Sequence, residues 1–146
     1  MRRYGTPPRP GMRYTPRPGV YVIAVQAGRV LLTHQQAPWS EFQLPGGGVD
    51  PSEPPLHALH REVFEETGWR IDRPRQVQAH RRFTYMPDYD LWAEKICTIY
   101  LARAVRALAA PSEAGHTAYL VPAVLAVDLV ASPGDRAALR QVLRGS

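Results

Sequence analysis

The stretch from Gly46 to Trp69 reads GGGVDPSEPPLHALHREVFEETGW and combines a run of glycines with a segment rich in glutamate. Two adjacent prolines fit only the first turn of a helix, where backbone N–H groups have no helical partners. A helix is therefore predicted from about Pro54 to Thr67, and Gly68 supplies its C-terminal stop.

The predicted helix carries an apolar stripe and, beside it, a sector of carboxylates. At about 100° per residue, the stripe that should face a sheet consists of Leu56, Leu59 and Val63. Glu62 lies three residues before Glu65 and four before Glu66, so the three carboxylates project from one sector. Converging carboxylates suit Mg²⁺ or Mn²⁺, which prefer oxygen ligands. Considered alone, an acidic helix face is also typical of solvated surface.

The glycine run indicates a site for anions next to these carboxylates. Gly46, Gly47 and Gly48 permit backbone conformations closed to other residues and a close approach by phosphate. We expect them just before the N-terminus of the helix, where unpaired N–H groups favour anions. A flexible turn is the alternative for the glycines alone, but the combination with convergent glutamates favours a metal and phosphate site.

The composition indicates one globular domain without a membrane span. The chain has 146 residues, of which 45% are hydrophobic, and no apolar run reaches the length of a transmembrane helix. No apolar segment follows the basic N-terminus as in a signal peptide, so a cytoplasmic location is expected. The single cysteine, Cys97, lies in an apolar run and is predicted to be a buried structural thiol.

Residues 1–19 form an Arg/Pro-rich tail, which is predicted to be extended and weakly ordered. Five of the 18 basic residues lie in this tail, which contains no acid. The remaining 13 basic residues balance 13 acidic ones, so the net charge of +5 belongs to the tail. The tail is interpreted as a solvated leader, with an arm that contacts RNA as the alternative.

Residues 20–146 are predicted to form a single α/β sandwich with a mixed sheet. Strands are expected in residues 20–34, as a hairpin turning at Ala27-Gly28, and in residues 75–86, 91–105 and 118–121. Helices are expected from Pro122 to about Val130 and in residues 132–143, where Ser132 would cap the last helix.

The stretch resembles the Nudix box of the Nudix hydrolase family. The family pattern is glycine, five residues, glutamate, seven residues, then Arg-Glu-aliphatic-any-Glu-Glu-any-Gly-aliphatic. The fixed positions are filled here by Gly47, Glu53, Arg61, Glu62, Val63, Glu65, Glu66 and Gly68. Trp69 stands in the last aliphatic position and is the one departure, which should alter packing and leave the metal positions intact.

This resemblance implies metal-dependent hydrolysis of a pyrophosphate in a nucleoside diphosphate linked to another group. It implies that Glu62, Glu65 and Glu66 hold Mg²⁺ or Mn²⁺, with a backbone carbonyl near Gly47. Arg61 would orient the carboxylates through salt bridges, and Glu53 would brace the loop against the helix. Such a metal can neutralise phosphate charge and lower the pKa of the attacking water.

Family members often carry one more carboxylate in a late loop. Glu113 lies at about that place and is the candidate for this catalytic role. Glu94 is the competitor, although it could instead pair with Arg81 or Arg82 across a hairpin. His116 is a candidate for substrate contact or for a structural role.

The substrate remains open between several nucleotide classes. Tyr85 lies 16 residues after Trp69, which resembles the diadenosine polyphosphate branch, and a nucleoside triphosphate is a further option. The proline typical of ADP-ribose enzymes is absent, because position 84 is threonine. Tyr85 could stack on a base, and Arg81 could bind an additional phosphate.

Two alternatives to a small-molecule hydrolase follow from the same residues. One is a regulatory module that binds nucleotides without turnover, against which the complete glutamate set argues. The other is a pyrophosphohydrolase for RNA 5′ ends, with the tail contacting RNA. The oligomeric state is open, with a homodimer as one option.

Overall fold

A computed structural model describes residues 1–145 as one mixed sheet between helices. The strands are β1 (Arg2–Arg3), β2 (Thr15–Gln26), β3 (Arg29–Gln35), β4 (Glu41–Gln43), β5 (Gly46–Gly48), β6 (Trp69–Met86), β7 (Leu91–Ala107) and β8 (His116–Pro122). The helices are α1 (Pro55–Thr67), α2 (Ala123–Leu129) and α3 (Pro133–Arg144), with a short 3₁₀ helix, η1 (Pro87–Tyr89).

The strand order is β1-β6-β7-β2-β3-β4, with β5 paired to β2 and β8 paired to β3. The β2–β7 and β1–β6 pairs are parallel, and the other pairs are antiparallel. β2 and β3 form the predicted hairpin, whose turn places Ala27 at φ 49° and Gly28 at φ 76°. These positive φ values at both central residues match the twist of a two-residue hairpin.

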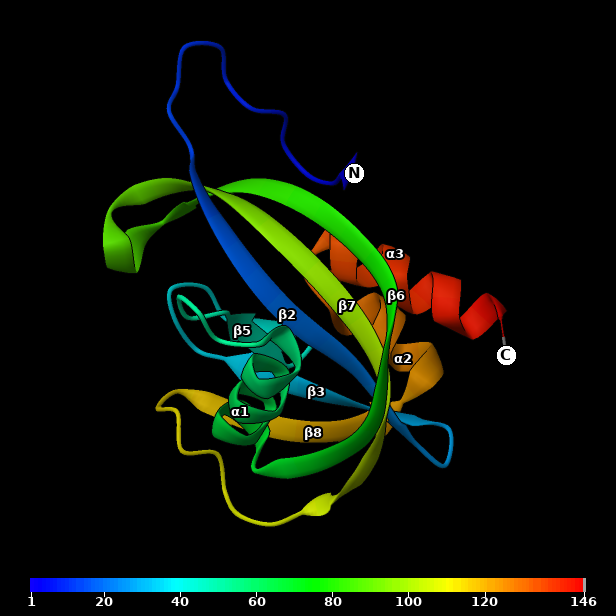
Figure 1. Ribbon diagram of the computed structural model, residues 1–146. Coiled ribbons are helices and arrows are strands. Elements are labelled where there is room, and N and C mark those ends of the chain that lie inside the picture. Colours follow the sequence, from blue (N-terminus) through cyan, green and yellow to red (C-terminus); the bar gives the residue numbers. More distant parts are fainter. Residues whose placement is uncertain (146) are drawn as a thin grey trace.

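Helices cover the sheet on both faces, with α1 on one side and α2 and α3 on the other (Figure 1). Alternate residues of a strand point to opposite faces, so the strands feed two cores. Val22 and Ala24 pack toward α1 with Leu59 and Val63, whereas Ile23 packs with residues of α2 and α3. The fold is therefore the predicted α/β sandwich with a mixed sheet.

Helix α1 begins and ends as its sequence predicts, but its buried face differs. Pro54 is the N-cap, and Gly68 ends the helix in the left-handed region at φ 73°. Leu56, expected in the apolar stripe, is 46% exposed, because the buried face begins only in the second turn with Ala58 and Leu59. Toward the C-terminal end of α1, Glu66 extends this buried face.

The glycine run forms strand β5, which corrects the prediction of a glycine loop leading directly into the helix. Gly46, Gly47 and Gly48 pair with β2, and a segment from Val49 to Glu53 separates them from the N-cap of α1. Within the run only Gly46 has a positive φ, at 150°. The glycines are required mainly by close packing, because a Cβ on Gly46 would lie 2.1 Å from the carbonyl oxygen of Val20.

Strand β2 begins at Thr15, five residues before the predicted start of order. Pro18 has no N–H to donate, which made the segment resemble a coil. The Pro18 carbonyl accepts from the Val49 N–H at 3.0 Å, so this residue directs its backbone polar groups away from β7. The missing N–H is therefore not needed for the pairing with β7, and the parallel ladder continues through Pro18. Arg2–Arg3 pairs with β6 at His80 and Arg81. The division of the chain into a tail and a domain at residue 19 stays a prediction.

Two other local expectations also need correction. Ser132 is the N-cap of α3 as predicted, but its side chain makes no capping hydrogen bond. β6 starts at Trp69 rather than at residue 75, with an irregular register between Asp72 and Arg75. Pro74 lies in that irregular stretch and has no N–H for the ladder, so the sequence predicts a strand only after it.

Candidate metal and substrate site

The four predicted glutamates, Glu62, Glu65, Glu66 and Glu113, lie in two overlapping groups, one of which also contains His116. Carboxylate oxygens of Glu62, Glu65 and Glu113 lie within 4.8 Å of one another. A second group, within the same limit, joins Glu66 and Glu113 to a ring nitrogen of His116. Glu113 belongs to both groups, so the structure brings it into the cluster, whereas it does not do so for Glu94.

Arg61 connects the cluster to the preceding loop. Its Nη1 donates to Glu62 Oε1 at 2.9 Å and lies 3.4 Å from the carboxylate of Glu65. Its Nη2 donates to the Gly48 carbonyl at 3.2 Å. These bonds hold the carboxylates of Glu62 and Glu65 in fixed directions. The pKa of Arg61 is raised above its usual value, mainly by its hydrogen bonds to Glu53 and then by the one to Glu62.

Glu53 anchors Arg61 from the opposite side. Arg61 donates from Nε to Glu53 Oε2 at 2.7 Å and from Nη2 to Glu53 Oε1 at 2.8 Å, a bidentate pair. Glu53 also accepts from the Asp50 N–H, and its Oε2 lies 2.8 Å from His57 Nδ1. The hydrogen bonds from Arg61 are the main reason that the pKa of Glu53 is well below its usual range. The geometry agrees with a bracing role between loop and helix.

Glu66 is the most buried carboxylate of the cluster, with 6% of the residue exposed. Its Oε1 accepts from the Gly46 N–H at 2.8 Å, and its Oε2 lies 3.6 Å from His116 Nδ1. Burial raises the pKa of Glu66 well above its usual value, and the nearby carboxylates of Glu113 and Glu62 raise it further. A cation bound here would reverse this effect, because an opposite charge favours the ionised form.

Glu62 lies tightly against the glycine strand. A Cβ added to Gly47 would lie 2.4 Å from Glu62 Oε2, so no larger residue fits at this position without moving the carboxylate. Burial raises the pKa of Glu62, although the hydrogen bond from Arg61 opposes that rise. The requirement for glycine at position 47 therefore comes from contact with a candidate metal ligand.

Backbone hydrogen bonds position the loop that carries Glu113. The carbonyl of Glu65 accepts from the N–H of Ser112 at 2.9 Å and from the N–H of Glu113 at 3.0 Å. Since the last carbonyls of a helix have no helical partners, the C-terminal turn of α1 can bind the loop in this way. The predicted late-loop carboxylate is thus fixed to the same helix as the other glutamates.

His116 is the member of the cluster that the sequence left undecided. Its Nδ1 lies 3.0 Å from the hydroxyl of Thr33, and its side chain is only 10% exposed. His116 is the first residue of β8 and pairs with Gln35 of β3. The spacing of Glu113 and His116, three residues apart, was visible in the sequence, but their approach to α1 depends on the β3–β8 pairing.

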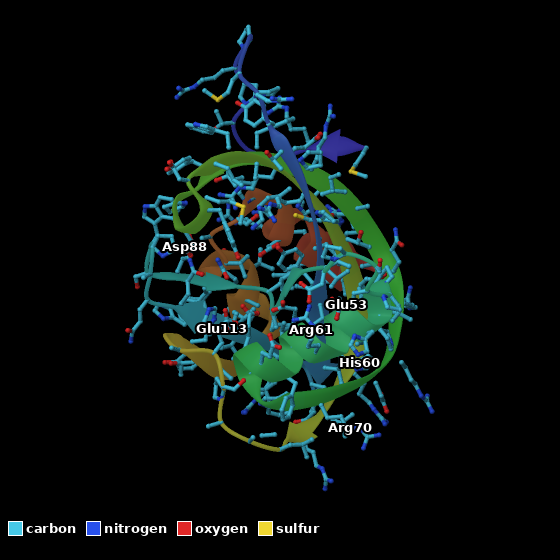
Figure 2. All side chains as sticks on the ribbon, turned by 60° about the vertical axis from the view of Figure 1, so that its left-hand side comes forward. Glu53, His60, Arg61, Arg70, Asp88 and Glu113 are labelled. Carbon is cyan, nitrogen blue, oxygen red and sulfur yellow. The ribbon has the colours of Figure 1, made fainter. Side chains whose placement is uncertain are left out.

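A cavity of about 890 Å³ opens beside the glutamates. Figure 2 shows Arg61 on α1, Glu53 and Glu113 on the loops beside it, and Asp88 on η1 farther along the molecule. The cavity is lined on one side by Glu62, Glu66 and Glu113 and extends to residues of β2, β6 and β7. Its size suits a nucleotide-sized ligand.

Two predicted substrate-binding residues do not line this cavity. The Tyr85 hydroxyl donates to the Asp90 carboxylate, and the Tyr85 ring packs on Trp92 at 5.3 Å. Arg81 pairs with Glu94 at 3.3 Å, which was one of the two alternatives for Glu94. The next residue, Arg82, lines the cavity instead, because consecutive residues of a strand point to opposite faces.

Cys97 is buried as predicted, and burial raises the pKa of its thiol to about 11. The thiol is therefore neutral near pH 7, which agrees with a structural role. Trp69, the departure from the family pattern, packs half-buried against the core on the α1 side. Neither feature alters the carboxylate cluster.

The donor set fits a hard divalent cation. Glu62, Glu65, Glu66 and Glu113 offer carboxylate oxygens in two groups that share Glu113, and carboxylate oxygen is the ligand type that Mg²⁺ and Mn²⁺ prefer. Without a cation, burial and mutual repulsion keep two of these groups at raised pKa values. The fold and site together define an α/β protein with a carboxylate metal site next to a nucleotide-sized cavity.

The chain belongs to the Nudix family, because the family model described as NUDIX domain matches residues 15–144. Among curated relatives, an RNA pyrophosphohydrolase of Pectobacterium atrosepticum is 40% identical over 70 residues, which are 48% of this chain and 38% of that protein. A protein of the same name from Proteus mirabilis is 42% identical over 55 residues, which are 38% and 30% of the two chains. The matched stretch thus spans less than half of these relatives.

Solved structures agree with the fold. A MutT NUDIX hydrolase from Burkholderia pseudomallei superposes with a TM-score of 0.68 at 26% identity, over 88% of this chain and 98% of that chain. A NUDIX hydrolase from Nitrosomonas europaea gives a TM-score of 0.72 at 16% identity, over 90% of each chain, and supports the fold alone. Among residues 1–145, none of the helices has the length and apolar character needed to cross a bilayer.

Proposed function

We propose that this protein hydrolyses a pyrophosphate linkage in a nucleoside diphosphate joined to another group. The observation that carries the proposal is that Glu62, Glu66 and Glu113 line a cavity that can hold a nucleotide, with Glu65 grouped beside Glu62 and Glu113. A regulatory module without turnover would not need this complete set of carboxylates.

Each residue of the site has a part in the proposed reaction. Glu62, Glu65, Glu66 and Glu113 would hold Mg²⁺ or Mn²⁺, which when bound neutralises phosphate charge and acidifies a water. Arg61 and Glu53 act as positioning residues through their hydrogen bonds. A carboxylate of the glutamate cluster that lies within one hydrogen bond of the attacking water would act as the general base.

The first test measures turnover on a panel of substrates with Mg²⁺. The panel contains diadenosine polyphosphates, nucleoside triphosphates, nucleotide sugars, ADP-ribose and an RNA oligonucleotide with a 5′-triphosphate. Wild type should release phosphate species from at least one of these, and Glu66→Gln should lower kcat by about a hundredfold or more, because the buried ligand loses its charge.

Glu94→Gln is the matched control, since Glu94 pairs with Arg81 and does not line the cavity. It should keep the turnover of wild type. No turnover of any panel member by wild type, or full turnover by Glu66→Gln, would overturn the proposal.

RNA 5′ ends are the second candidate substrate, because the curated relatives named above are RNA pyrophosphohydrolases. The RNA arm of the panel decides this candidate. A higher kcat/KM for the 5′-triphosphorylated oligonucleotide than for a free nucleoside triphosphate would support it, and a lower one would exclude it.

A further inference from the structure

A row of three cationic side chains crosses the sheet inside the cavity. Arg17 of β2 pairs directly with Lys95 of β7, and Lys95 pairs directly with Arg82 of β6. Directly paired residues of neighbouring strands project from the same face of a sheet. All three residues line the cavity that also contains Glu62 and Glu66.

The row is not neutralised by ion pairs. Among residues 1–145, Arg17, Lys95 and Arg82 form no salt bridge, whereas Arg61, Arg81 and Arg103 are each paired with a carboxylate. The Nε of Arg17 is buried without a hydrogen-bond partner. Like charges directly opposite one another destabilise a sheet, and an unpaired buried donor adds a further cost.

Among residues 1–145, the acids that line the cavity form no salt bridge with the row, although the charge of Lys95 partly opposes the rise that burial causes in the pKa of the Glu66 carboxyl. Asp135, also in the cavity, accepts a hydrogen bond from the Leu44 N–H at 3.3 Å, and its charge interacts with Lys95 and Arg82 only at longer range. Asp88 lines the same cavity and has no ion pair within the described part of the chain, and Glu41 accepts hydrogen bonds from Gln35 and Gln43.

Aromatic rings hold two members of the row in position. The guanidinium of Arg17 lies over the ring of Tyr89, 5.1 Å from its centroid, and the Lys95 ammonium lies 6.0 Å from the ring centroid of Tyr21. Such contacts orient a cation while leaving its N–H donors free to bind an anion.

We propose that Arg17, Lys95 and Arg82 bind phosphate oxygens of the substrate outside the linkage that is hydrolysed. The inference rests on the proposed function, and it narrows the substrate class to nucleotides that carry at least three consecutive phosphates. The glutamates would hold the metal that binds the reacting pyrophosphate, and the cation row binds the next phosphate of the chain. Nucleotide sugars and ADP-ribose have only two phosphates, so they leave the row unpaired.

The test is a calorimetric titration with inorganic tripolyphosphate in the presence of EDTA, which removes any contribution of a metal at the glutamates. Wild type should bind tripolyphosphate, and Lys95→Gln should weaken binding by about tenfold or more, because a charge-assisted contact is lost. Lys95→Arg should retain binding, which separates charge from folding. Arg75→Gln is the matched control, since Arg75 is an exposed residue of β6 outside the cavity.

The titration tests the phosphate subsite and the substrate panel tests the hydrolase proposal, so one experiment can fail while the other succeeds. Loss of tripolyphosphate binding in Lys95→Gln, with wild-type binding in Arg75→Gln, supports the subsite even if no panel member is hydrolysed. Equal binding by wild type and Lys95→Gln, or an equal loss in Arg75→Gln, overturns it. Preferred turnover of ADP-ribose or a nucleotide sugar also overturns it while leaving the hydrolase proposal intact.

Two further kinetic measurements with Mg²⁺ distinguish which kind of substrate presents the phosphates to the row. A nucleoside triphosphate and a 5′-triphosphorylated oligoribonucleotide both present the three phosphates. In either arm, Lys95→Gln should lower kcat/KM by about tenfold, and the arm with the larger wild-type kcat/KM identifies the source. An unchanged kcat/KM in both arms counts against the subsite.

Discussion

Asp135 is a buried acid that lines the cavity from the first turn of α3. Its Oδ2 accepts from the Leu44 N–H, which lowers the pKa, but burial outweighs this bond and raises the pKa to about 6. The folded protein therefore retains a proton that the unfolded chain releases near pH 4. Stability conferred at this residue decreases as the pH rises from about 4 through 6 and stays lower above that range.

Asp135→Asn should remove this pH dependence while preserving an acceptor for the Leu44 N–H. The variant should gain about 2–3 kcal/mol of unfolding free energy relative to wild type between pH 4.5 and pH 7.5. Urea denaturation of both proteins at the two pH values measures the difference, and all other titrating groups cancel in it. If the unfolding free energies of the variant and wild type differ by the same amount at both pH values, Asp135 is already charged in the folded protein at pH 4.5. That result would contradict a raised pKa of Asp135.

The end of α1 is determined by contact between backbones. Gly68 takes a left-handed conformation, and its carbonyl accepts from the N–H groups of Leu108 and Ala109 at 2.8 Å and 3.2 Å. A Cβ on Gly68 would lie 1.8 Å from the carbonyl oxygen of Ala109. The glycine of the family pattern thus joins α1, which carries the candidate metal ligands, to the segment that follows β7.

Gly68→Ala should destabilise the protein more than Gly28→Ala. Both positions have similar positive φ values, but a Cβ on Gly28 meets no atom within 4 Å. Gly28→Ala should cost only the backbone strain of about 1–2 kcal/mol, and Gly68→Ala should cost about 1–3 kcal/mol more from overpacking. Thermal unfolding of the two variants gives the comparison, and equal losses would contradict the steric explanation.

The sequence predicts α1 and its glutamates well because their spacing is local. Arg61 and Glu53 make contacts that follow from a helix and the loop next to it. Gly68 ends the helix as its sequence predicts, but its contacts with Leu108 and Ala109 are long-range. The exposure of Leu56 could not be predicted from local spacing, because it depends on how far the sheet extends beneath the first turn of α1. The choice of Arg82 rather than Arg81 for the cavity depends on strand register, which bulges such as that between Asp72 and Arg75 shift.

At the scale of the whole molecule, the site assembles segments far apart in the chain. The glutamates of α1 contact the loop before β8 and the glycines of β5, so occupation of the site should stabilise the complete fold. The raised pKa values of Glu62 and Glu66 oppose the binding of a cation at low pH, because protons must first leave.

Mg²⁺ should therefore raise the melting temperature more at pH 8 than at pH 5.5. At one hundred times the dissociation constant, binding adds about 2.7 kcal/mol, or about 5–10 °C for a domain of this size. Differential scanning calorimetry with and without MgCl₂ measures the effect in wild type, in Glu66→Gln and in the control Glu94→Gln. The increase should be lost only in Glu66→Gln, and equal increases at both pH values would argue against a carboxylate site.

The Glu113 loop is attached to α1 by main-chain hydrogen bonds to the Glu65 carbonyl. Because these bonds do not involve the side chain at position 113, its chemistry can be exchanged while the path of the loop is kept. Replacing the carboxylate there by an imidazole or a thiol would change the ligand type offered to the ion without rebuilding the scaffold. Position 113 is thus a natural starting point for engineering a catalyst with a different metal preference.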